Sequence, residues 1–105
     1  MALTQKKLQD LVGQGFPDLY TRNQRLWEEK AERAYDYAAR SMPDRQAVRV
    51  DDVSEVLTPA LEVDQTLRDF LHEGKLRQKY WVEWFCDYIL DQLWEQLRTR
   101  RRRGG

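Results

Sequence analysis

Few residue types that carry out catalysis occur in this 105-residue chain, and their spacing does not assemble an active site. Ser41 and Ser54 are the only serines, and neither lies in a glycine-flanked nucleophile motif. Cys86 is the only cysteine and His72 the only histidine, and Cys86 has the sequence context of a small core residue. No glycine-rich phosphate loop is present in the sequence. We therefore predict that the protein is not an enzyme and uses no cofactor.

A row of four acidic residues, each four positions after the last, runs along the predicted C-terminal helix. Like charges at this spacing destabilise a helix by about a few tenths of a kcal/mol per pair, so the row requires solvent or a basic partner. A metal site is the weakest interpretation, because carboxylate sites draw on several elements and His72 is expected to interact with the end of its own helix. The row consists of Glu83, Asp87, Asp91 and Glu95.

Positive charge is concentrated near the C-terminal end of the sequence. Residues 98–103 carry +5 and the rest of the chain carries −5, which together give the net charge of zero. Positively charged side chains are stabilising at the C-terminal end of a long helix, where the helix dipole is negative. The same arginines can also contact phosphates or an acidic protein surface, including the acidic row of a second subunit. The residues that would contact a polyanion are Arg98, Arg100, Arg101, Arg102 and Arg103.

The C-terminal helix carries two separate apolar surfaces when its residues are placed about 100° apart on a helical wheel. One stripe continues along the whole helix and is predicted to be the intramolecular core. A second, aromatic arc lies roughly 150° away and occupies only the first half of the helix, so one neighbouring helix cannot cover both. The core stripe consists of Val82, Cys86, Ile89, Leu90, Leu93 and Leu97.

The aromatic arc has two main interpretations. Other helices of a small bundle can pack around both sides of this half of the helix. Alternatively, part of the arc binds a second subunit or another protein, since Trp and Tyr are favoured interface anchors. A small-ligand pocket is less favoured because no convergent polar groups accompany the rings. The residues predicted for a protein interface are Tyr80, Trp81, Trp84 and Tyr88, with Phe85 on the same arc.

Apolar periodicity and helix-ending residues predict the elements that position these groups. We predict helices over residues 4–13, 23–41, 59–74 and 75–100. Pro17 is expected in the turn after the first helix or at the first position of the next one. The apolar face of residues 23–41 is expected to pack on the core stripe of the C-terminal helix, with the charged residues between positions 28 and 33 in solvent.

The segment between residues 43 and 59 is predicted to be less regular. Val48 and Val50 are expected on one side of an extended segment, and Asp52 is expected to cap a short helical turn. Pro59 is expected to interrupt the helix at this point, with Thr58 as the N-cap of the next helix.

Length and composition predict one folded domain. The chain is 41% hydrophobic and 34% charged, with no net charge, which differs from the composition of disordered chains. No segment approaches the roughly 20 apolar residues of a membrane span, and the single cysteine excludes an intramolecular disulfide. These features favour a cytoplasmic location and no membrane partner.

Together, these observations predict an all-α bundle of about four helices with a long C-terminal helix. Residues 1–97 are expected to form the domain and residues 98–105 an Arg-rich tail. The predicted function is a noncatalytic protein-interaction module, either a homo-oligomer or an accessory subunit of a larger assembly, with no evident small-molecule substrate. The alternative is a small nucleic-acid-associated subunit that uses the Arg-rich segment, although no recognised reading motif accompanies it.

Overall fold

The structure is a computed structural model that describes residues 4–42, 47–74 and 80–104. These residues form helices and no strand, which confirms the predicted all-α bundle. The number of helices exceeds the predicted four because α2 lies between the first two predicted helices, and because the predicted helix 59–74 is divided, with its first residues belonging to a helix that begins at Val50. The helices are α1 (Gln5–Gly13), α2 (Phe16–Arg22), α3 (Gln24–Ser41), α4 (Val50–Glu62), α5 (Gln65–Glu73) and α6 (Tyr80–Gly104).

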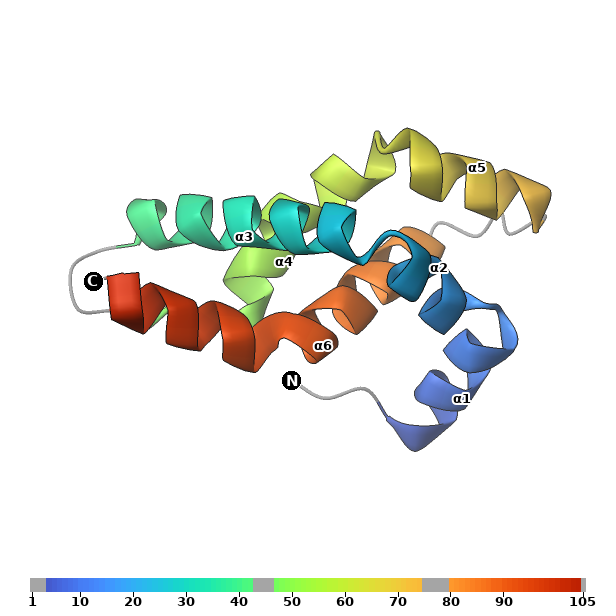
Figure 1. Cartoon of the computed structure of the whole chain (residues 1–105), viewed down its shortest axis with the longest axis horizontal. Helices are drawn as coiled ribbons and strands as arrows, with labels where there is room; N and C mark the ends of the chain where they lie inside the picture. The colour runs from blue at the N-terminus through green and yellow to red at the C-terminus, as the bar shows by residue number, and fades with distance from the viewer. Residues whose placement is uncertain (1–3, 43–46, 75–79, 105) are drawn as a thin grey trace.

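Three helices, α3, α4 and α6, pack against one another and form the centre of the molecule. Figure 1 shows α3 and α6 running in the same direction with α4 crossing behind them, while α1, α2 and α5 lie at the end where α3 and α6 begin. The ring contacts agree with this parallel arrangement. Trp27 meets Phe85 with ring centroids 4.9 Å apart, and just over two turns later on both helices Tyr35 meets Trp94 at 5.6 Å.

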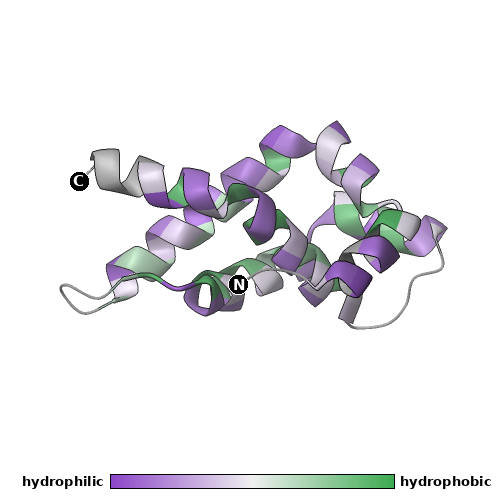
Figure 2. Ribbon diagram, turned by 90° about the horizontal axis from the view of Figure 1, so that it is seen from below, coloured by the Kyte–Doolittle hydropathy of each residue, from purple (hydrophilic) through white to green (hydrophobic). Residues whose placement is uncertain are grey.

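The buried core follows the helical periodicity of the sequence. Both α3 and α6 direct one apolar face inward, and Figure 2 shows hydrophobic and hydrophilic residues alternating along the helices. The predicted core stripe of α6 is buried, except that Val82 at its beginning is only partly buried. The buried residues of α3 are Trp27, Ala31, Ala34, Tyr35 and Ala38.

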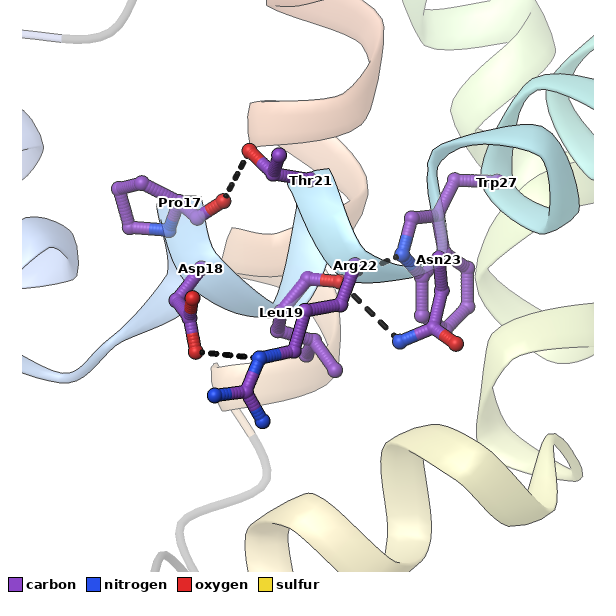
Figure 3. A network of polar contacts seen from close by, with 7 residues as sticks. All are labelled: Pro17, Asp18, Leu19, Thr21, Arg22, Asn23 and Trp27. Atoms are coloured by element: carbon purple, nitrogen blue, oxygen red, sulfur yellow. Dashed lines mark hydrogen bonds and ion pairs between the residues drawn. The ribbon is translucent and has the colours of Figure 1, made fainter.

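A short network of polar contacts joins α2 to α3 (Figure 3). The indole Nε1 of buried Trp27 donates a hydrogen bond to the carbonyl oxygen of Leu19 at 3.2 Å. The side-chain amide of Asn23 donates to the same oxygen at 3.3 Å. The carbonyl of Leu19 lies near the end of α2, where carbonyl oxygens lack partners within the helix, so these two side chains satisfy it. Asn23 thereby stabilises the break between α2 and α3.

The structure corrects the prediction for the start of α4. Val50 is the first residue of the helix rather than part of an extended segment. Arg49 is the N-cap residue, and Asp52 is the third helical residue, where its carboxylate accepts a hydrogen bond from the Arg49 backbone N–H at 2.9 Å. Asp52 therefore supplies the carboxylate that a capping box has at its third helical position. The N-cap itself lies three residues before the position predicted for it.

Pro59 does not interrupt the helix as predicted. It lies inside α4, which continues to Glu62, so Thr58 is a helical residue and not an N-cap. The missing N–H of Pro59 leaves the carbonyl of Glu55 without its helical donor, and both residues are on the exposed side of the helix, where water can serve as the donor. The division between helices comes instead at Asp64.

Asp64 is the N-cap of α5 and connects that helix to α3. Its Oδ1 accepts a hydrogen bond from the Leu67 backbone N–H at 2.9 Å, and its Oδ2 lies 3.3 Å from Nζ of Lys30. The side chains of Lys30 and Asp64 are only 23% and 8% exposed. Lys30 was predicted to point into solvent, and this partly buried ion pair corrects that expectation.

Candidate protein-interaction surfaces

The aromatic arc is divided in the structure between a buried part and a surface part. Trp81 and Tyr88 are each 8% exposed and Phe85 is fully buried. Tyr80 is 49% exposed, and Trp84 is partly buried. The fold of one chain therefore buries three of the five rings, and Tyr80 and Trp84 are the two that reach the surface.

Helix α2 covers the buried part of the arc. Phe16 makes edge contacts with Trp81 and Phe85, with centroids 5.6 and 5.2 Å apart, and Tyr20 makes an edge contact with Tyr88 at 5.7 Å. Gly15, which precedes the helix, has a φ of 83°, a left-handed conformation that glycine adopts at low cost. This turn allows the chain to reverse and bring Phe16 into the core.

The covering role of α2 was missed by the sequence reasoning, although the signal was present. Phe16, Leu19 and Tyr20 have the spacing of one helical face, and all three are buried. Pro17 is the second residue of α2, one position after the first helical position that was one of the two alternatives predicted for it. A seven-residue helix was too short to stand out by periodicity from the turn around it.

Tyr80 and Trp84 form a layered aromatic group at the beginning of α6. Their rings are stacked, with centroids 6.2 Å apart and an interplanar angle of 22°. The Trp84 ring in turn meets the buried Trp81 ring edge-on at 4.8 Å. Because Trp84 is held between an exposed ring and a buried ring, its orientation is restricted before any partner binds. We call Tyr80 and Trp84 the α6 aromatic surface.

The acidic row lies on the same face of α6 as the α6 aromatic surface. At about 100° per residue, all six residues fall within roughly 120° of one another around the helix. Glu83 and Glu95 are exposed, whereas Asp87 and Asp91 are partly buried. Glu95 binds Arg98 through an ion pair of 2.9 Å, so its charge is partly compensated within the helix. This partly exposed face of α6 is thus aromatic in its first turns and acidic along its length.

The predicted polyanion contacts are described only in part. Arg98 is exposed, and its guanidinium donates to both carboxylate oxygens of Glu95, at 2.9 and 3.2 Å. The backbone of α6 continues as a helix to Gly104, so the Arg-rich segment begins within this helix. The side chains of Arg100, Arg101, Arg102 and Arg103 lie outside the described residues, and their contact with a polyanion stays a prediction.

A third surface feature is a groove between α3 and α4 that the sequence reasoning did not anticipate. It has a volume of about 250 Å³. Small apolar side chains form its base, and two cationic side chains and a tyrosine that is 63% exposed surround it. Lys30, Arg33 and Tyr37 have the helical spacing i, i+3 and i+7, and this spacing is the only feature of the groove that the sequence shows. The lining residues are Lys30, Arg33, Ala34, Tyr37, Val56 and Ala60.

The residues that were weighed as candidates for catalysis or metal binding do not form a common site in the structure. Cys86 is fully buried, and burial raises the pKa of its thiol despite hydrogen bonds with Thr58 and Ser54 that lower it. Its Sγ lies 3.6 Å from Oγ of Ser54. His72 is exposed in the last turn of α5. Among the described residues, no group of three or more histidine, cysteine or acidic side chains is arranged to hold a metal ion.

Comparisons with known proteins leave the chain without an identified relative. No family model, no curated protein and no solved structure matches it. Among the described residues, no helix has the length and apolar character needed to span a membrane.

Proposed function

We propose that the protein is a noncatalytic protein-interaction module that binds its partner through the α6 aromatic surface. The observation that carries this proposal is the half-exposed Tyr80 ring stacked on Trp84, which rests on buried Trp81. Aromatic side chains at a protein surface bury a large apolar area on binding, and a ring that is already oriented loses little further freedom. Tyr80 and Trp84 have these properties of interface anchors.

The partner is a second copy of the chain or another subunit of an assembly. The acidic residues beside the aromatic rings, Glu83 above all, favour a partner surface that carries positive charge around an apolar centre. Charges at the edge of an interface mainly affect the rate and specificity of association, so we expect the rings to contribute most of the affinity.

Substitution of Trp84 tests the proposal when it is compared with a substitution in the core. Leu93 is 3% exposed, and Leu93→Ala is expected to lower the free energy of unfolding by about 2–5 kcal/mol through lost burial and a cavity. Trp84→Ala is expected to leave the chain folded and to weaken association by at least about tenfold. The measurements are urea denaturation and sedimentation at several protein concentrations, because dissociation and unfolding can be coupled.

Photo-crosslinking identifies which molecule contacts this surface. A photoreactive phenylalanine analogue in place of Tyr80 is expected to give a covalent adduct in the cell of origin, and Trp84→Ala in the same chain is expected to reduce its yield. The same analogue at the exposed position Arg25 serves as the control. A Tyr80 probe that gives no more adduct than the Arg25 probe would exclude this surface as the binding site.

A further inference from the structure

The groove between α3 and α4 has the size of a side-chain binding site. Its volume is about 250 Å³, below the roughly 300–1,000 Å³ of pockets that enclose drug-sized ligands. The base consists of Ala34, Val56 and Ala60, whose short side chains leave room for one or two large side chains of a protein. The exposed Tyr37 ring extends this apolar surface toward solvent.

The charged residues around the groove favour an acidic occupant. Lys30 is held by its ion pair with Asp64, so these two charges largely cancel. Arg33 is exposed and makes no ion pair or hydrogen bond with the described residues. Of the nearby acids on α3, Glu29 is engaged by Arg25 at 3.5 Å, and Asp36 also has an interaction partner. The groove therefore offers one positively charged side chain beside an apolar base.

The aromatic and acidic face of α6 has the complementary chemistry. Tyr80 and Trp84 supply large rings, and exposed Glu83 lies next to them on the helix. The described lining residues of the groove all belong to α3 and α4, and α6 packs against these two helices from the side of the core. One chain thus presents the groove and the aromatic, acidic face at the same time, on separate parts of its surface.

We infer that the protein binds a second copy of itself, with the α6 aromatic surface of one copy seated in the α3–α4 groove of the other and Glu83 facing Arg33. This inference rests on the proposed function, since it names the partner of the same aromatic surface. The two contacting surfaces differ, so the interface is heterologous, and each copy keeps one unused surface that can bind a further copy. Such association produces closed rings or open chains of copies rather than a symmetric pair.

Mixing two variants tests this arrangement directly. Trp84→Ala removes the larger ring of the α6 aromatic surface, on which Tyr80 stacks, and keeps the groove. Arg33→Glu reverses the charge at the groove and keeps both rings. Each variant alone is expected to be a folded monomer at concentrations where the wild type associates. An equal mixture is expected to form a dimer of one copy of each, which cannot grow because the other pair of surfaces is disabled. Native mass spectrometry resolves this mixed dimer when one variant is isotope-labelled.

Arg68→Glu is the matched control for Arg33→Glu. It makes the same charge reversal at an exposed side chain of α5 outside the groove, and it is expected to associate like the wild type. Circular dichroism of every variant establishes that the helices are retained. If Arg33→Glu is unfolded, Tyr37→Ala replaces it as the groove variant, because the Tyr37 side chain is largely exposed.

Three results would overturn the inference: a wild-type chain that is monomeric at high concentration, a groove variant that associates like the wild type, or a mixture that gives no mixed dimer. In each case the proposed function is judged separately by the crosslinks from position 80. A crosslink to a different protein would retain the interaction function and reject self-association, whereas the absence of any crosslink above the control would reject both.

Discussion

At the scale of single residues, the tyrosines between α2 and α6 link stability to pH. Burial raises the pKa of Tyr20 to about 12 from its ordinary 10.0, with smaller contributions from Glu28 and Tyr88. Burial likewise raises the pKa of Tyr88, with a further contribution from Asp91. Since the two rings contact each other at 5.7 Å, ionisation of either one would place a charge between the helices.

The folded state is therefore expected to lose stability as the pH rises from 10 toward 12. Below pH 10 Tyr20 is protonated in both the folded and the unfolded chain, and its contribution to stability is complete. Above pH 10 the unfolded chain releases this proton while the folded chain retains it, which favours unfolding. Urea denaturation at several pH values measures the effect. Tyr20→Phe should show a shallower decline, and an unchanged decline would assign the pH dependence to other groups.

At the scale of elements, Asp64 has two functions that substitution can separate. Asp64→Ala removes both the N-cap of α5 and the ion pair with Lys30, and it is expected to lower the free energy of unfolding by about 1–3 kcal/mol. Asp64→Asn retains a side-chain acceptor for the Leu67 N–H and removes only the charge. We expect Asp64→Asn to cost less than Asp64→Ala in urea denaturation, and equal costs would show that the cap contributes little.

Substitution of Pro59, unlike that of Asp64, is expected to stabilise the folded chain. Within a helix interior proline is about 3 kcal/mol less favourable than alanine, and part of this difference is offset because proline also restricts the unfolded chain. Pro59→Ala restores the N–H that the Glu55 carbonyl lacks, so we expect the free energy of unfolding to rise by about 1–3 kcal/mol. A loss of stability would mean that α4 needs the proline at this position, for example to shape its curvature.

The elements also show which parts of the fold can be predicted from sequence. The long periodic stretches of α3 and α6 identify the apolar faces that pack in the core, because each pattern repeats over about four helical turns. Pro59 was misjudged because a solvent-facing position tolerates the missing hydrogen bond, and sequence alone does not show which carbonyl faces water. The groove was missed because it requires two helices to meet, and periodicity describes each helix separately.

At the scale of the whole molecule, the Arg-rich end of α6 can be removed to separate folding from any polyanion contact. Leu97 is buried, and Arg98 and Thr99 after it are exposed. Truncation after Arg98 is therefore expected to leave thermal stability nearly unchanged. Any salt-dependent binding of nucleic acid by the full chain should disappear with these residues, because each lost phosphate contact reduces the salt dependence. Binding that survives truncation would have to use another surface.

The parallel packing of α3 and α6 has a consequence for synthesis on the ribosome. Helix α6 supplies eight of the twenty core residues that the structure describes as buried, and it is the last of the described helices to be made. Until residues 80–97 have emerged, the apolar faces of α2, α3 and α4 have no partner to cover the side that α6 will occupy. The nascent chain must pass through this period with Phe16 and Trp27 uncovered, which makes it a substrate for chaperones that hold exposed apolar segments. The core is therefore expected to be completed only after residues 80–97 have left the ribosome.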